Sequence, residues 1–216
     1  MSEIAFAKDN DWSVRKVAAP ADEEERPKRR ERAAMYEFTP EYLYRRAFSE
    51  VTLLDLFGTF DFKVGRCYNF LTAGDIDGMS YLKALLRLQS LRHCIVSTWC
   101  MSAGDAFQLI TWIEGGAIKQ LDLYVGEIFK GSYGAVWAQL REYYASHPGC
   151  GRMAIFRNHS KIIAGIGERF AFGLQTSANF DTNPRTEQAS LSIDEGLYRF
   201  YKEYFDGIIT FNKEDR

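Results

Sequence analysis

The feature of the sequence with the clearest chemical meaning is a histidine and a lysine two positions apart in FRNHSKIIAG, residues 156–165. In a strand, side chains two positions apart point to the same face, so we expect His159 and Lys161 to lie side by side. Both groups are costly to bury without partners, and two neighbouring cations repel each other. The pair therefore predicts a site that binds an anionic ligand.

A second polar pair lies in the next predicted strand, RFAFGLQTSANF, residues 169–180. If this strand and the preceding one form an antiparallel hairpin, Ser177 and Asn179 lie beside His159 and Lys161. The four side chains then offer donors suited to phosphate oxygens, together with one nucleophile. Downstream, Glu187 could accept the imidazole N–H, fix its tautomer and raise its basicity. The alternative interpretation is a polar strand end followed by a turn.

The segments NHSKII, TSANF and NPRTEQ resemble the signature of the phospholipase D superfamily, which combines H-x-K, G-S-x-N and a downstream glutamate. The resemblance covers about residues 60–210. It implies that His159 is the catalytic nucleophile and forms a phosphohistidine intermediate. It also implies that Lys161, Ser177 and Asn179 bind the phosphoryl oxygens, and that Glu187 orients the histidine. This chemistry needs no metal ion or other cofactor.

Two positions depart from the family pattern. The acidic residue expected five positions after the lysine falls on Ile166, and Thr176 replaces the glycine of G-S-x-N. The chain also contains one H-x-K, whereas the family mechanism uses two histidines, one as nucleophile and one as general acid. The resemblance therefore implies a homodimer in which His159 of each subunit meets across a two-fold axis.

The substrate implied by the resemblance is nucleic acid, because single-motif members of the superfamily are often nucleases. A chain without a membrane anchor also suits DNA or RNA better than a phospholipid in a bilayer. Three arginines flank the motif, Arg152, Arg157 and Arg185, and we expect Arg157 and Arg185 to contact substrate phosphates. Two alternatives stay open: a catalytically degenerate module that binds nucleic acid or a protein partner, and a lipid phosphodiesterase.

The composition of the chain bears on three other properties: overall charge, location in the cell and metal binding. Its 216 residues carry a formal net charge of −2, so the molecule as a whole has no strong field for polyanions. No segment has the roughly 20 apolar residues of a membrane span, and the N-terminus lacks the pattern of a signal peptide, so we expect a cytoplasmic protein. No metal site is predicted, because the four cysteines lack CxxC spacing and Asp75 and Asp77 are better explained as helix caps.

The elements that must position these residues follow an alternating order. Residues 1–34 carry an acidic and then a basic block and are predicted to be a disordered charged tail. The resemblance implies that residues 35–216 form one phospholipase D-like domain. The first helix is expected to begin at Thr39 and Pro40. Strands are predicted at 65–74, 92–102, 118–126, 151–166 and 169–180, and further helices at 77–91, 103–116, 131–149 and 192–208. We predict an α/β fold, a mixed β-sheet flanked by helices on both faces.

Overall fold

The computed structural model describes residues 40–181 and 185–209 of the chain. The predicted tail, residues 1–34, and Thr39, the predicted cap of the first helix, lie outside the described residues. The chain divides into two compact units, residues 1–42 and 43–216. The second unit contains all seven described strands and most of the first described helix.

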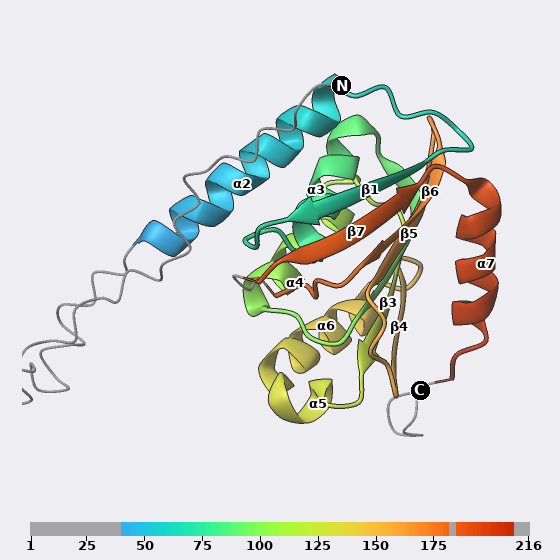
Figure 1. The fold of residues 1–216 in the computed structure, drawn as a ribbon. Helices are drawn as coiled ribbons and strands as arrows, with labels where there is room; N and C mark the ends of the chain where they lie inside the picture. Colours follow the sequence, from blue (N-terminus) through green and yellow to red (C-terminus); the bar gives the residue numbers. More distant parts are fainter. Residues whose placement is uncertain (1–39, 182–184, 210–216) are drawn as a thin grey trace, which may run out of the picture. The chain divides into compact units, whose positions relative to one another are not determined.

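One seven-stranded mixed sheet forms the centre of this unit (Figure 1). The order of strands across the sheet is β1-β7-β6-β5-β2-β3-β4. Strands β2, β3 and β4 run parallel to one another, and the other neighbours pair antiparallel. The strands are β1 (Cys67–Thr72), β2 (Leu91–Thr98), β3 (Leu121–Gly126), β4 (Gly151–Phe156), β5 (Ile162–Gly167), β6 (Ala171–Thr176) and β7 (Glu187–Ser192).

Helices cover both faces of the sheet, which confirms the predicted α/β architecture (Figure 1). The helices are α2 (Pro40–Thr59), α3 (Gly78–Leu88), α4 (Ala103–Glu114), α5 (Phe129–Ser132), α6 (Gly134–Ser146) and α7 (Glu195–Asp206). Alternate residues of a strand face opposite sides, so Ile95 of β2 packs in the cluster under α7, while Cys94 and Val96 join the larger cluster on the other side. None of the described helices combines the length and apolarity of a membrane span.

Short polar side chains fix where the helices begin. Asp77 caps α3 by accepting a hydrogen bond from the backbone N–H of Ser80 at 2.8 Å, which confirms its predicted role. Ser102 and Asp105 form a reciprocal capping box at the start of α4. Asp194 caps α7 through the N–H of Leu197 at 2.7 Å. These helices therefore start at positions that the sequence itself marks.

The segment 151–166, predicted as one strand, is two strands separated by a loop. Strand β4 lies at one edge of the sheet beside β3, whereas β5 lies on the other side of β2. Residues 157–161 must therefore cross the carboxyl ends of β3 and β2, so the prediction that His159 and Lys161 lie within a strand is wrong. The hairpin is confirmed for β5 and β6, but β7 was not predicted.

Helix α7 is attached to the sheet by a buried network of hydrogen bonds as well as by apolar packing. The Asp122 carboxylate accepts hydrogen bonds from His93 Nε2 at 2.9 Å and from the backbone N–H of Arg152 at 3.0 Å. The other nitrogen of His93, Nδ1, lies 2.8 Å from the hydroxyl of Tyr198 on α7. Burial and the Asp122 carboxylate raise the pKa of Tyr198 to about 12, so its hydroxyl stays protonated and donates.

We expect Asp122→Ala to lower the free energy of unfolding by about 2–3 kcal/mol, because it leaves two partly buried donors without an acceptor. The measurement is urea denaturation followed by circular dichroism. The control is Asp61→Ala, which removes an exposed carboxylate 4.0 Å from Lys63 and should change stability by less than about 0.5 kcal/mol. Equal losses of unfolding free energy in the two variants would show that this hydrogen-bond network does not contribute to stability.

Candidate functional site

The predicted site residues lie at the end of the sheet where the parallel strands β2, β3 and β4 terminate. We call this end of the sheet the site edge. Because β5 begins at this edge, the antiparallel β6 ends there and β7 begins there. Lys161 directly precedes β5, Ser177 directly follows β6, and the backbone N–H of Thr176 donates to the carbonyl of Lys161 at 3.1 Å. The residues gathered at this edge are His159, Lys161, Ser177, Asn179 and Glu187.

The loop that carries the histidine is held by Asn158, which is only 4% exposed. Its amide nitrogen donates to Ser97 Oγ at 2.8 Å and to the Tyr124 carbonyl at 3.2 Å, at the ends of β2 and β3. Its amide oxygen accepts from the backbone N–H and the hydroxyl of Ser160, at 2.9 and 2.7 Å. The hydroxyls of Ser97 and Ser160 lie 2.7 Å apart, which closes a ring of hydrogen bonds across the loop.

A glycine beneath the loop allows this close approach. A Cβ atom at Gly126 would lie 2.6 Å from Cδ1 of Trp99 and 2.9 Å from the backbone oxygen of Asn158. The indole of Trp99 in turn contacts the ring of His159, with the ring centroids 5.3 Å apart. The end of β3 therefore has to lack a side chain for the tryptophan and the histidine loop to occupy their positions.

His159 is exposed and lies beside the lysine, as the spacing predicts, although both residues belong to a loop. Lys161 Nζ is 3.3 Å from His159 Nδ1 and donates to the backbone carbonyl of His159 at 2.8 Å. Burial lowers the pKa of Lys161 from its usual value, while Cys100 and Glu187 act in the opposite direction. The ammonium group therefore lies near the histidine ring and within electrostatic reach of Glu187.

Ser177 connects the end of β6 to the start of β7. Its hydroxyl donates a short hydrogen bond to the carboxylate of Glu187 and accepts the backbone N–H of Gln188 at 2.9 Å. Thr176, which stands where the family has glycine, donates its hydroxyl to the carbonyl of Gln188 at 3.0 Å. The threonine is therefore accommodated at the strand end, and Glu187 is held next to Ser177.

Asn179 is two residues after Ser177 and lies between two buried neighbours, Ala178 and Phe180. Its backbone oxygen accepts the N–H of Gly78 at the start of α3, at 3.0 Å. Its side-chain oxygen is buried and has no hydrogen-bond partner among the described residues. Buried polar atoms are nearly always satisfied, so this amide has hydrogen-bonding capacity that a ligand could use.

The flanking arginines do not form one patch. Arg157 is exposed on the histidine loop, and Arg185 is exposed shortly before β7. Arg152, by contrast, lies at the opposite end of β4, where its guanidinium donates to the backbone oxygen of Asp206 at the end of α7 at 3.2 Å. Ile166 also lies away from the site, near the far end of β5. The position where the family has an acidic residue is therefore remote from Lys161.

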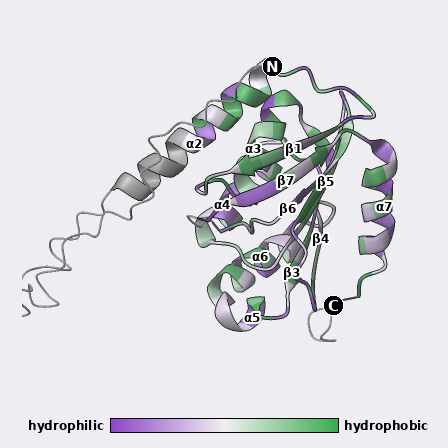
Figure 2. Cartoon of the chain, viewed as in Figure 1, coloured by the Kyte–Doolittle hydropathy of each residue, from purple (hydrophilic) through white to green (hydrophobic). Residues whose placement is uncertain are grey.

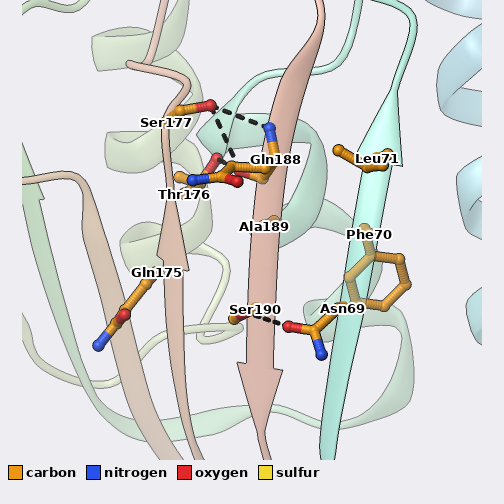
Figure 3. A pocket seen from close by; sticks show the side chains of 9 residues that line it. All are labelled: Asn69, Phe70, Leu71, Gln175, Thr176, Ser177, Gln188, Ala189 and Ser190. Carbon is orange, nitrogen blue, oxygen red and sulfur yellow. Dashed lines mark hydrogen bonds between the residues drawn. The ribbon is translucent and has the colours of Figure 1, made fainter.

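Two hollows adjoin the site edge. The larger, about 620 Å³, is lined by residues 69–71, 175–177 and 188–190, and Figure 3 shows Ser177 bonded to Gln188 at one end of it. The smaller, about 360 Å³, lies between the histidine loop and α7 and includes His159. Gln175 of the larger hollow donates to the hydroxyl of Tyr201, which lines the smaller one, so this short hydrogen bond marks the boundary between them. No group of three histidine, cysteine or acidic side chains within residues 40–181 and 185–209 is placed to hold a metal ion.

No family model and no curated protein matches the sequence. Similar solved structures include polyphosphate kinase from Porphyromonas gingivalis, with 9% identity and a TM-score of 0.49 over 68% of this chain and 27% of that chain. The archaeal chromatin protein TrmBL2 has 13% identity and a TM-score of 0.43 over 79% and 62% of the two chains. Phosphatidylserine synthase of Haemophilus influenzae Rd KW20 has 13% identity and a TM-score of 0.46 over 65% and 37%. This chain thus spans less than two thirds of each neighbour, and similarity at this level says nothing about activity.

Two residues of the site were not predicted from the sequence. Asn158 and Trp99 position the histidine through hydrogen bonds and ring contact, yet neither belongs to the motif. Asn158 could have been found as an amide directly before the histidine in a segment flanked by apolar strands. Trp99 gave no signal, because an aromatic residue at a strand end is ordinary in a protein core.

Proposed function

We propose that the protein is a metal-independent phosphodiesterase, a nuclease that acts on DNA or RNA through a phosphohistidine intermediate in a homodimeric active site. The observation that carries this proposal is an exposed histidine, His159, with the ammonium group of Lys161 3.3 Å from its ring. The loop that bears both groups is fixed at the site edge by Asn158. The resemblance of these segments to the phospholipase D superfamily supports the same chemistry.

In the proposed first step, a ring nitrogen of His159 attacks the phosphorus atom. A P–N bond forms, and the P–O bond to the leaving oxygen breaks. That oxygen takes a proton from the second histidine, which we assign to His159 of the other subunit. In the second step, water attacks the phosphohistidine, gives a proton to the second histidine and breaks the P–N bond. The two steps leave both histidines in their starting states.

The remaining site residues bind and position in this mechanism. Lys161 and Asn179 donate to the phosphoryl oxygens, whose charge increases as the bond to phosphorus forms. The hydroxyl of Ser177 is at the same end of the sheet and is oriented by Glu187 and Gln188. Glu187 also offsets the positive charge of Lys161 and orients the histidine. Arg157 and Arg185 contact neighbouring phosphates of the strand.

The test is hydrolysis of labelled single- and double-stranded DNA and RNA in EDTA, with an alkaline quench that preserves a phosphoramidate bond. We expect cleavage, a phosphate adduct that peptide mass spectrometry locates on His159, and a dimer by sedimentation. Binding without cleavage or adduct would instead identify a catalytically degenerate nucleic-acid module. Hydrolysis of phosphatidylcholine vesicles with no nucleic-acid cleavage would identify a lipid phosphodiesterase.

The general acid of this mechanism already imposes one alkaline limb on the pH profile of kcat/KM. We expect a second alkaline limb, at higher pH but below the usual lysine pKa of about 10.4. Burial lowers the pKa of Lys161, and the ammonium form that binds phosphoryl oxygens is lost as the pH rises through that pKa. Lys161→Arg should move the limb to higher pH, because guanidinium stays charged. Lys63→Arg, at an exposed position away from the site, should leave the limb in place. An unmoved limb in Lys161→Arg would remove Lys161 from phosphate binding.

A further inference from the structure

The cavity between the histidine loop and α7 is walled by aromatic and apolar side chains. His159 and Arg157 line it from the loop, Phe156 and Ile162 from the adjoining strand ends, and Phe200 and Tyr204 from α7. Its volume of about 360 Å³ is near the lower end of the range for small-ligand sites, about 300–1,000 Å³. The cavity is therefore of a size for one flat ring system next to the proposed nucleophile.

Two of the aromatic side chains on α7 do not contribute to the core. Tyr198, Tyr201 and Phe205 are buried against the sheet, whereas Phe200 and Tyr204 are 60% and 58% exposed. Residues four positions apart lie on the same side of a helix, so these two rings form a ridge along one edge of the cavity. Figure 1 shows α7 running alongside the sheet. The exposure of Phe200 and Tyr204 means that the ridge contributes little to the packing that holds the helix. The two rings continue the apolar wall of the cavity, and contiguous exposed apolar surface of this kind is a feature of ligand-binding grooves.

We propose that this cavity binds a base of a single-stranded nucleic acid by stacking it on Phe200 and Tyr204 while the adjacent phosphate lies at His159. The inference rests on the proposed nuclease function and narrows its substrate. In a duplex the faces of the bases are already stacked on one another and cannot reach a ring on the protein. An unpaired base can, and stacking on an aromatic side chain contributes about 1–3 kcal/mol per base without regard to sequence.

Charge and continuity favour a nucleic-acid strand over a second protein molecule as the occupant. The cavity combines apolar rings with the cationic Arg157, which matches the flat bases and charged phosphates of a nucleotide. His159 itself lines the cavity, so whatever fills it touches the proposed nucleophile. The polar hollow that begins at the Gln175–Tyr201 hydrogen bond continues the path on the other side, past Ser177. A strand bound at His159 thus has an aromatic wall on one side and hydroxyl and amide groups on the other.

The test compares cleavage of three substrates: a 15-nucleotide single strand, the same strand with abasic residues flanking the cleaved phosphate, and the duplex. We expect Phe200→Ala/Tyr204→Ala to lower kcat/KM for the base-bearing single strand roughly 10- to 100-fold, which is the stacking contribution of one base. Cleavage of the abasic strand should change less than about two-fold, because the phosphate contacts remain. The native protein should prefer the single strand to the duplex.

The matched control is Phe107→Ala, which removes an equally exposed ring, 64% exposed, on α4 and should change none of the three rates. Phe200→Leu/Tyr204→Leu keeps apolar bulk on the ridge without rings, and it should show the same loss if stacking is the cause. An unchanged preference for the base-bearing strand in both double variants would overturn the inference and leave the nuclease function standing. A native protein that cleaves no nucleic acid would overturn the nuclease function itself. Dissociation of a dimer in the double variants, with equal losses on all substrates, would overturn the inference and assign the ridge to a second copy of this chain.

Discussion

His159→Ala is expected to lower the rate of phosphodiester hydrolysis by roughly 10⁴-fold or more, because it removes the nitrogen proposed to bond to phosphorus. Saturation with substrate cannot replace a missing nucleophile, so raising the substrate concentration should not restore the rate. In a dimer each active site also loses its general acid, since the same substitution changes both subunits. The measurement is single-turnover cleavage in EDTA, in which the phosphate adduct should disappear along with the products.

Stability should be almost unaffected, because the His159 side chain is exposed and loses only its ring contact with Trp99 and its exposed contact with Lys161. The matched control is His147→Ala, at an exposed histidine that stacks on Tyr143 at the end of α6 and should leave the rate unchanged. Residual cleavage at the native rate in His159→Ala would show that the activity belongs to another site or to a contaminant. Retained substrate binding in the same variant would confirm that the chemical step was removed and the binding surface was kept.

Asn158→Ala should cost both stability and rate, unlike the histidine substitution. It removes the acceptor of Ser160 and the donor to Ser97 and to the Tyr124 carbonyl, and so leaves several buried polar groups unsatisfied. We expect the free energy of unfolding to fall by about 2–3 kcal/mol. We also expect the rate to fall roughly 100-fold, because the loop then holds His159 less accurately against the phosphate.

Gln120→Ala is the control, because Gln120 is an exposed amide just before β3, at the end of the sheet away from the site, and its side chain donates one hydrogen bond, to the carbonyl of Gly149 at 3.3 Å. Its unfolding free energy and rate should stay close to those of the native protein. The rate of Asn158→Ala must be measured well below its unfolding transition, so that loss of positioning is separated from loss of fold. A full native rate under those conditions would show that the hydrogen-bonded ring stabilises the loop without positioning the histidine.

Much of the fold followed from periodicity and caps. The helix at 77–91 was predicted from its apolar face and is capped by Asp77, and the β5–β6 hairpin was predicted from the turn between two apolar runs. The strand β7 was missed because its sequence, EQASLS, is mostly small and polar. Only Ala189 and Leu191 face the core, and Figure 2 colours most of this strand as hydrophilic, unlike the central strand β5. Hydrogen-bond pairing with β1 and β6 determines the extended conformation of β7, which the hydrophobic pattern of its own sequence does not indicate.

The boundary between β4 and β5 was missed for a related reason. An apolar run interrupted by RNHSK fits a single strand as well as two, and only the sheet order decides between them. Spacing placed His159 beside Lys161 correctly even though the assumed strand was wrong, because the clamped loop also brings the two side chains together. Arg152 was grouped with the motif by its position in the chain, but the length of β4 separates it from the loop. Proximity in sequence was therefore a poor guide to charge near the site.

The path of the histidine loop over the ends of β3 and β2 determines when the site can exist during synthesis. The loop is clamped by residues that precede it, but Lys161 is held by pairing with Thr176, and Ser177 by pairing with Gln188, both later in the chain. Neither contact can form until these later residues have been synthesised. A ribosome-bound chain that ends before β7 therefore lacks the assembled candidate site, and the proposed activity requires a complete sheet.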